Sequence, residues 1–418
     1  MTENVLKEKN CTKSSLNIKE SSKRTILALQ HLIAMFGATV LVPILTGLNP
    51  SIALFSAGMG TLIFHACTKG KVPVFLGSSF AFIPVMLTVK EMYNGDLSYA
   101  QGGMMVAGLI YVLLSFIVKK IGVDKIKKYL PSQVVGPMII VIGMNLIPTA
   151  FGMASENFSI AIITLTTALI INFKAKGFLK QLSILIGVIV GYLVALKVGI
   201  VDVTLIKESP IISAPPFNLP KFDIGAIAII APVVLAVFME HIGDITTNGQ
   251  VVGKNFIEDP GLNRTLLGDG LATMAASLIG GPANTTYGEN TGVLAITKNY
   301  DPSILRLSAV FAIILGFVSK IGALLSTIPT SVMGGISIML FSMISLIGVK
   351  TIKNDGVKFN FKNILIMVTI LVLGLGSGII EKRLGITIGI PITDTVKITG
   401  LSFAAIVGVV LNGVLNRN

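Results

Sequence analysis

The sequence has few charged residues and no tryptophan. Of its 418 residues, 13% are Asp, Glu, Lys or Arg, whereas soluble globular proteins contain about 25%. Hydrophobic residues make up 53% of the chain, and the mean hydropathy is +0.84. This composition excludes a soluble globule and indicates a protein with many membrane-spanning segments. Any aromatic belt at the membrane interface must consist of tyrosine and phenylalanine.

Cysteine and histidine are also scarce. Cys11 lies in a polar N-terminal segment and Cys67 at the end of an apolar run, so no disulfide framework is expected. The 3 histidines are well separated, and no nucleophile lies beside a base. An enzyme therefore lacks support, and no metal or organic cofactor is expected. Residues 1–24 are rich in Lys and Ser without an apolar core, which predicts a flexible cytoplasmic tail and not a signal peptide.

Apolar windows of about 20 residues, the length that spans a bilayer, recur along the chain. They predict an all-α membrane protein with fourteen transmembrane segments. These lie near residues 25–47, 51–68, 72–90, 99–118, 131–150, 157–173, 179–200, 223–247, 267–280, 283–297, 303–327, 330–348, 361–380 and 397–415. A longer polar connection near residues 201–222 separates the two halves.

The net charge of +13 is distributed unevenly. With the N-terminus in the cytoplasm, 25 of the 33 Lys and Arg residues fall in cytoplasmic segments. This asymmetry follows the positive-inside rule and supports an even number of spans with both termini in the cytoplasm. The basic charge is thus explained by orientation in the lipid bilayer, and nucleic acid is not an expected partner.

One stretch, Gly280–Lys298, interrupts what would otherwise be a membrane span. Irregular backbone at membrane depth must be buried in protein or line a cavity. Asn284–Thr286 is expected to run extended into Tyr287, and Gly288 to open a half-helix whose free N–H groups point at the break. Carriers bind their substrates at broken spans of this kind, so the stretch predicts a site.

A second irregular stretch, Lys69–Phe82, has the same ingredients. Val74–Leu76 is a short β-forming run, and Gly77–Ser79 supplies breaker and cap residues for a helix that begins near Phe80. The third and tenth spans are seven apart. A repeat of seven spans is odd in number, so its second copy is inverted. We therefore expect two inverted repeats, each with a broken span, and two short antiparallel strands.

The eighth predicted span has the densest intramembrane charge. Glu240 and Asp244 are four residues apart, so both carboxylates project from one helix face. Ionisable groups at bilayer depth cost several kcal/mol and are functional by default. The alternative is that the pair caps a span that reaches the cytoplasm near Thr246. His241 lies on another face and is interpreted as packing.

Other polar residues in the spans receive structural interpretations. His31 and His65 lie near span ends and are expected to form hydrogen bonds. Asp269 is interpreted as a helix-start carboxylate. Lys320 has a long stem that can reach the membrane surface.

Three carboxylates, those of Glu240, Asp244 and Glu289, come from the two spans that flank the break. Burial and like-charge repulsion oppose the ionisation of all three, so at least one should hold a proton near neutral pH. A neutral ligand could donate N–H groups to one carboxylate while another binds a proton. Helix-end N–H groups would meet its carbonyls, and the Phe80 ring offers a flat face. The implied ligand is small, flat and rich in donors and acceptors, and a nucleobase fits.

Several motifs carry a resemblance to a known family. Glu289–Lys298 matches a signature of an acidic or amide residue, Asn-x-Gly, four residues, then Thr and Arg or Lys. Asn284–Asn290 matches its uracil-type version, and Gly37–Pro43 and Gly77–Phe82 match further motifs. The chain resembles the nucleobase-ascorbate transporter family, and within it the bacterial uracil permeases, which are uracil:proton symporters. The likeness covers residues 25 to 415.

The resemblance implies a particular architecture. It implies fourteen spans in two inverted repeats, arranged as a core domain that moves against a gate domain, in a homodimer. After the tail, residues 25–128 and 222–328 would form the core domain, and residues 129–221 and 329–418 the gate domain.

The resemblance also implies roles for individual residues. Those expected at the substrate are Ser79, Phe80, Glu240, Tyr287, Gly288 and Glu289. The two glutamates would bind uracil at the bilayer midplane, the Phe80 ring would pack on it, and backbone N–H groups at Phe80 and Gly288 would meet its carbonyls. Asp244 would belong with both glutamates to the proton-coupling network, in which the proton is the coupling ion.

Two positions differ from the uracil-type pattern. Asp244 stands where some members have His, and Phe341 where related carriers have Tyr. A purine or xanthine:proton symporter of the same fold is therefore the alternative within the family. An anion carrier or channel is the alternative from another class, because one fold can serve several functions. Three buried carboxylates argue against an anion path.

Overall fold

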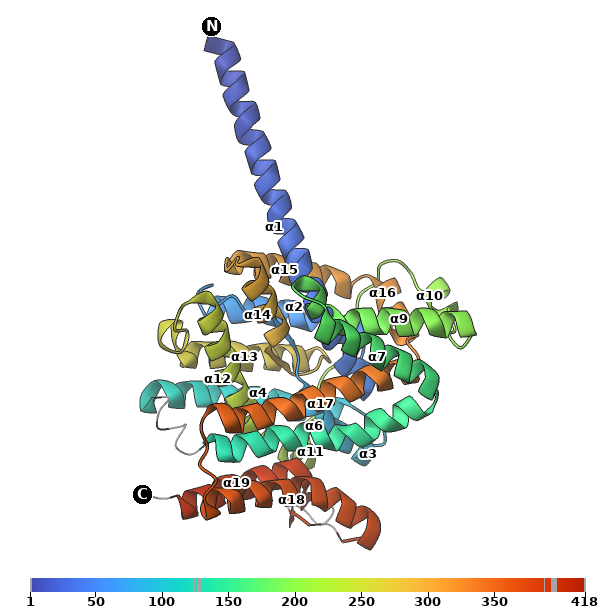
Figure 1. Ribbon diagram of the computed structural model, residues 1–418, viewed down its shortest axis with the longest axis vertical. Helices are drawn as coiled ribbons and strands as arrows, with labels where there is room; N and C mark the ends of the chain where they lie inside the picture. The colour runs from blue at the N-terminus through green and yellow to red at the C-terminus, as the bar shows by residue number, and fades with distance from the viewer. Residues whose placement is uncertain (1, 123–124, 126–129, 387, 392–396, 417–418) are drawn as a thin grey trace.

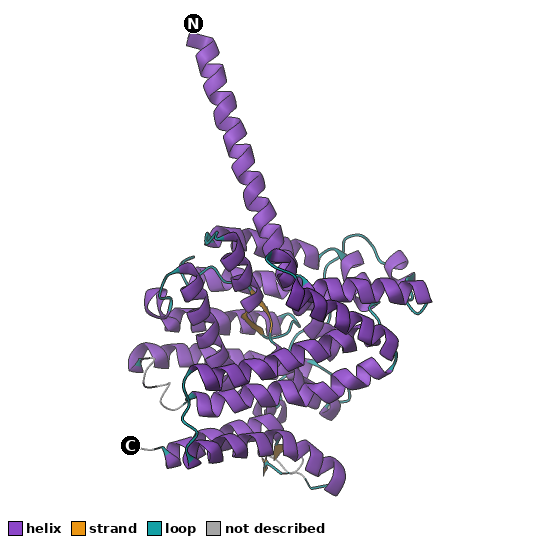
Figure 2. Cartoon of the chain, viewed as in Figure 1, coloured by secondary structure: helices purple, strands orange, loops and turns teal. Residues whose placement is uncertain are grey.

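The computed structural model describes residues 2–122, 125, 130–386, 388–391 and 397–416. The domain boundary expected between residues 128 and 129 lies outside this part of the chain. The described protein is a bundle of helices with a few very short strands, as the sequence predicts (Figure 2).

The first half of the chain contains eleven described helical or strand elements before the polar connection ends. They are α1 (Thr2–Thr46), α2 (Pro50–Cys67), β1 (Leu76–Ser78), η1 (Phe80–Phe82), α3 (Ile83–Met92), α4 (Ser98–Ile121), α6 (Ser132–Ser155), α7 (Phe158–Lys174), α8 (Phe178–Gln181), α9 (Ser183–Val198) and α10 (Thr204–Glu208).

The second half contains the remaining described elements. Its elements are α11 (Ile224–Ile230), η2 (Ala231–Val233), α12 (Val234–Val252), η3 (Ile257–Gly261), α13 (Leu262–Leu278), β2 (Asn284–Thr286), α14 (Gly288–Thr297), α15 (Pro302–Gly316), α16 (Ser319–Ser326), α17 (Thr330–Asn354), α18 (Phe361–Leu384), β3 (Ile390–Pro391), β4 (Lys397–Ile398) and α19 (Gly400–Leu415).

Seven helices in the described residues are long and apolar enough to cross a bilayer, and α15 with α16, bent by 76°, would make an eighth. The other predicted spans coincide with shorter helices, or with strand and helix pairs. The membrane-protein class is therefore confirmed in its coarse form, and the count of fourteen stays a prediction.

The N-terminal segment differs from the expected tail. Helix α1 begins at Thr2, and its first part projects away from the bundle (Figure 1). Residues 2–24 contain several Lys, Glu and Leu residues, which are good helix formers. An apolar helix that follows directly removes the cost of nucleation, so a segment without an apolar core can extend that helix.

The two interrupted stretches meet inside the bundle. Strands β1 and β2 pair antiparallel, with Leu76 opposite Thr286 and Ser78 opposite Asn284, which confirms the predicted pairing (Figure 2). Ser79 N donates to Ala283 O at 2.8 Å and so extends the ladder. All six strand residues are buried. The backbone polar groups of these irregular stretches are thus hydrogen-bonded within the protein, as a span without regular helix requires.

Helices elsewhere approach closely through small residues. Helix α6 packs along α17, and α4 packs along α13. At Gly348 on α17, an added Cβ would lie 2.6 Å from the Gly136 carbonyl oxygen of α6. At Gly270 on α13, it would lie 2.8 Å from the Gly108 carbonyl oxygen of α4. Such contacts are how helices associate where no hydrophobic effect drives them together.

Candidate functional site

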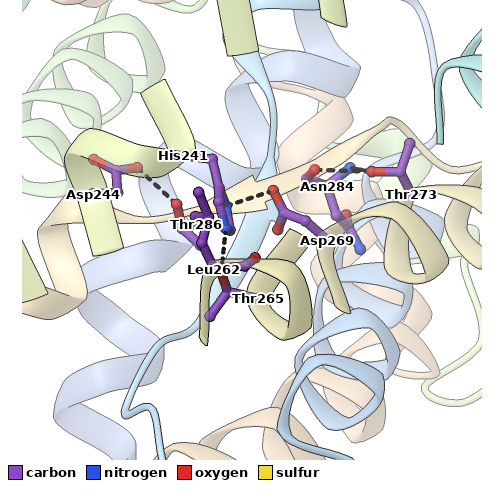
Figure 3. A network of polar contacts seen from close by, with 8 residues as sticks. All are labelled: His241, Asp244, Leu262, Thr265, Asp269, Thr273, Asn284 and Thr286. Atoms are coloured by element: carbon purple, nitrogen blue, oxygen red, sulfur yellow. Dashed lines mark hydrogen bonds and ion pairs between the residues drawn. The ribbon is translucent and has the colours of Figure 1, made fainter. Parts of the chain in front are cut away.

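Helix α12 carries two carboxylates and packs against strand β2 and helix α14. Glu240 and Asp244 are both half-buried, one turn apart on the helix. The Thr286 hydroxyl of β2 donates to Asp244 Oδ2 at 2.8 Å (Figure 3). The helix continues to Val252, two turns beyond Asp244. The pair therefore lies within the helix and does not cap its end.

Glu289 supplies the third carboxylate from the first turn of α14. The helix begins at Gly288, directly after the strand residues, because Tyr287 is held extended by its N–H bond to Phe75 O at 3.1 Å. Glu289 is half-buried, and α12 and α14 pack against each other. The elements that carry the three carboxylates are therefore neighbours. That the three carboxylates act together on a substrate or a proton stays a prediction.

Two exposed glycines leave open space beside these carboxylates. Gly243 lies between the two acidic residues on α12, and Gly288 lies at the start of α14. At both, no further atom lies within 4 Å of the position that a Cβ would occupy. The first N–H groups of a helix have no partner within the helix. The start of α14 can therefore donate to a small ligand from an open side.

Phe80 opens the 3₁₀ turn η1 directly after β1. Its ring is half-buried and packs against two of the hydrophobic clusters, one around Phe75 and Tyr287 and one around Phe341. Phe341 itself is fully buried in α17. The ring thus lies beside the strand pair and keeps part of its surface free.

Ser79 and Tyr287 are placed differently from the other predicted residues. Their exposed fractions are 1% and 4%. The Tyr287 hydroxyl donates to Ser78 O at 2.9 Å, and its ring covers Gly77. Both side chains are therefore buried among protein atoms, and their backbones form the strand ladder. As side-chain ligands of a substrate these two positions are not favoured by the structure.

Two residues interpreted as structural form a buried polar pair. His241 Nδ1 lies 3.1 Å from Asp269 Oδ2, and His241 Nε2 lies 2.9 Å from Thr265 Oγ1 (Figure 3). The interpretation of Asp269 as a helix-start residue is wrong, because α13 begins at Leu262 and Asp269 lies two turns inside it. The signal that could have found it is an ionisable residue within an apolar span.

The other two histidines form hydrogen bonds, as predicted. Asn290 Nδ2 of α14 lies 3.2 Å from His31 Nδ1 on α1 and donates to the His31 backbone O at 3.0 Å. His65 Nε2 lies 2.9 Å from Val74 O and fixes the chain that enters β1. These contacts confirm the structural interpretation and hold the two broken segments in place.

Comparison with known proteins gives one family. A family model described as "Permease family" matches residues 22–381. The uracil permease of Bacillus caldolyticus is 44% identical over 405 residues, which cover 93% of this chain and 91% of that protein. The uracil permease of Bacillus subtilis (strain 168) is 41% identical, with coverage of 93% and 91%.

A solved structure shares the fold at low identity. The transmembrane domain of the cyanobacterial bicarbonate transporter BicA matches with a TM-score of 0.63 at 15% identity, and the match covers 84% of this chain and 94% of that domain. At this identity the likeness concerns the fold alone.

Proposed function

Because this chain belongs to the permease family, a family of transporters and not of enzymes, we propose that it imports uracil by symport with protons. The relatives named uracil permeases support the substrate. The observation that carries the proposal is that α12, which bears Glu240, packs against α14, which bears Glu289 in its first turn and has open space at Gly288.

Uracil has two N–H donors and two carbonyl acceptors on one flat ring. Carboxylates of Glu240 and Glu289 can accept the N–H groups, and helix-start N–H groups at Phe80 and Gly288 can donate to the carbonyls. The partly free face of Phe80 can pack on the ring. In this arrangement every polar atom of the base has a partner of the right kind.

Proton coupling follows from the three carboxylates. Their mutual repulsion in a half-buried place opposes simultaneous ionisation. A bound proton reduces this repulsion and leaves one carboxylate free to accept an N–H group. Asp244 is held by Thr286 at one edge of the group, a position suited to taking the proton while the glutamates hold the base. Uracil and the proton would then bind together.

The proposal includes an architecture. Residues 25–128 and 222–328 would form the core domain, and residues 129–221 and 329–418 the gate domain, within fourteen spans in two inverted repeats. The protein would act as a homodimer in the bacterial cytoplasmic membrane, with both termini in the cytoplasm. The proposed core domain contains the strand pair β1 and β2 and all three carboxylates.

The test is uptake of labelled uracil into proteoliposomes with an imposed pH gradient. Unlabelled uracil, thymine, xanthine, hypoxanthine and bicarbonate are added as competitors. We expect uracil to compete at the lowest concentration and an inward proton gradient to accelerate uptake. Competition by xanthine without competition by uracil would favour the purine carrier. Competition by bicarbonate alone would favour an anion carrier.

A further inference from the structure

The glycine of the Asn-x-Gly signature, Gly292, meets a side chain from a distant part of the sequence. Gly292 lies in α14, and the short helix α8 packs against this helix. A Cβ added at Gly292 would lie 2.5 Å from Nε2, 2.8 Å from Cδ and 2.9 Å from Oε1 of Gln181, the last residue of α8. The carboxamide of Gln181 therefore occupies the place that a side chain at position 292 would take.

This place borders the proposed substrate site. Residues three and four apart share a helix face, so Gly292 lies on the face of Glu289 and Gly288. Side chains on a helix lean toward its N-terminus, so a group at position 292 covers the turn that precedes it. That turn is the first of α14, which bears Glu289 and has open space at Gly288. The Gln181 carboxamide thus forms one wall of this space.

The contact can form and break without the loss of a side-chain hydrogen bond. Gly292 has no side chain, and its backbone groups belong to the hydrogen-bonded turns of α14. The carboxamide therefore meets α14 by van der Waals contact, which is weak for each pair of atoms. Helix α8 belongs to the proposed gate domain and α14 to the proposed core domain. Relative motion of the two domains would open the contact, and solvent already reaches both half-buried residues.

We propose that Gln181 closes the substrate site from the gate domain and restricts it to a base with a single ring. The inference rests on the proposed uracil symport. The carboxamide fills space beside Glu289 that the second ring of a purine would need. Gly292 is required because a side chain there would displace the carboxamide. Gln181 is thus a specificity-determining residue that acts through the volume it occupies.

The first experiment measures calorimetric binding of uracil and xanthine to the purified full chain. Gln181→Ala removes the carboxamide, so the affinity for xanthine relative to uracil should rise at least about tenfold, the low end of the discrimination that one small group gives in a pocket. Gln181→Met keeps an unbranched side chain of similar length without the amide, so it should retain the wild-type selectivity. Lys180→Ala, at an exposed position of the same helix, is the control for a long side chain removed from α8.

Wild-type selectivity in Gln181→Ala would overturn the proposal. Equal loss of uracil affinity in the alanine and methionine variants, without a gain for xanthine, would also overturn it, because the carboxamide would then act as a hydrogen-bonding ligand of the base. A wild-type protein that binds xanthine in place of uracil would contradict the proposed function and, with it, the restriction to one ring.

A second measurement tests the contact itself. Gly292→Ala places a methyl group where the carboxamide lies, and the end of a flexible side chain can move aside. The unfolding temperature should therefore stay near that of the wild type, while xanthine affinity should change in the same direction as in Gln181→Ala. Because both changes remove one contact, the double variant should show no larger gain than Gln181→Ala alone. Additive gains would show that the two residues act separately and would refute the closure.

Discussion

At the scale of single residues, the three carboxylates of the site are not equivalent. Asp244 already accepts a hydrogen bond from Thr286 at 2.8 Å. Glu240 and Glu289 are the two carboxylates proposed to bind uracil. Glu240 comes from the middle of α12 and Glu289 from the first turn of α14. Substitutions at the three positions should therefore have different effects on binding and on coupling.

The glutamates should be needed for binding. Glu240→Gln or Glu289→Gln turns an ionised acceptor into an amide, which leaves a uracil N–H facing a poorer partner. Loss of a charged hydrogen bond costs about 2–3 kcal/mol, roughly 30- to 150-fold in affinity. Calorimetry of uracil binding measures this loss. Glu258→Gln, at an exposed carboxylate of η3 between α12 and α13, is the control. Wild-type affinity in either site variant would refute the assignment.

Asp244 should instead be needed for coupling. Asp244→Asn keeps a hydrogen-bond acceptor for Thr286 but cannot exchange a proton. Uracil affinity should stay within about tenfold of the wild type, a difference of about 1.4 kcal/mol, while acceleration of uptake by an inward proton gradient should disappear. Uptake into proteoliposomes with and without the gradient measures this. Full acceleration in this variant would show that the coupled proton is held elsewhere.

Residue types identified the acidic positions, but not which side chains point toward them. Glu240, Asp244 and Glu289 could be grouped from helical spacing and from a broken span. The contact of His241 with Asp269 depends on how α12 packs on α13, 28 residues further along the chain, and no local pattern encodes it. The direction of Tyr287 likewise depends on Gly77 of the other strand.

At the scale of elements, the strand pair requires a glycine. A Cβ added at Gly77 would overlap the ring of Tyr287 and lie 2.8 Å from Thr39 Oγ1. Gly77→Ala should therefore force the ring out of its buried place and destabilise the protein by about 1–3 kcal/mol, as overpacking does. Thermal unfolding in detergent, with uracil binding in parallel, measures the effect.

A matched glycine serves as the control for that substitution. Gly152 on α6 has no atom within 4 Å of an added Cβ, so Gly152→Ala should not lower the unfolding temperature. Equal behaviour of the two variants would show that the Tyr287 ring can move without cost.

The start of α4 offers a pH-dependent contribution outside the membrane. The hydrogen bond from Lys221, with further ones from Ser98, lowers the pKa of Asp96 from 3.8 to about 2. A carboxyl group whose pKa is lower in the folded than in the unfolded protein stabilises the fold at pH values above the unfolded-state pKa. This stabilisation is lost as the pH falls through the folded-state pKa. The unfolding temperature should therefore fall between pH 4 and pH 2, and less so in Asp96→Asn or Lys221→Gln. Unchanged pH dependence in both would exclude this pair as the cause.

The ends of an element could be predicted where local residue types determine them, and less well where packing against other elements determines them. Glycine, proline and threonine marked the breaks at β1 and β2, and the expectation of an inverted repeat predicted the pairing. The bend of 76° between α15 and α16 and the start of α13 at Leu262 were not predicted. The bend lies within an apolar run, whereas Leu262 lies in a mixed-charge stretch between two of the predicted spans, where hydropathy marks no helix.

At the scale of the whole molecule, the proposed core and gate domains meet along α1 and α9. A Cβ added at Gly37 on α1 would lie 3.1 Å from Ile184 Cγ2 on α9. The surrounding seam is an apolar crevice, lined by Phe36, Val40, Leu41, Ile44, Leu185, Val188, Leu325, Ile328, Met333 and Ile336. Because few polar groups would have to be separated there, the two sides can move past each other at low cost.

A covalent bond across this seam should stop transport without removing the site. An added Cβ at Gly37 would lie 3.7 Å from Ile184 Cβ, within the range of about 3.5–4.5 Å found in disulfides. Gly37→Cys with Ile184→Cys, in a chain whose Cys11 and Cys67 are replaced by serine, should cross-link on oxidation. Uracil uptake should then fall at least about tenfold and return on reduction, while uracil binding persists, because none of the three carboxylates lines the seam. Each single cysteine variant is the control for oxidation itself. Full uptake by the cross-linked protein would exclude motion between α1 and α9 as part of the transport cycle.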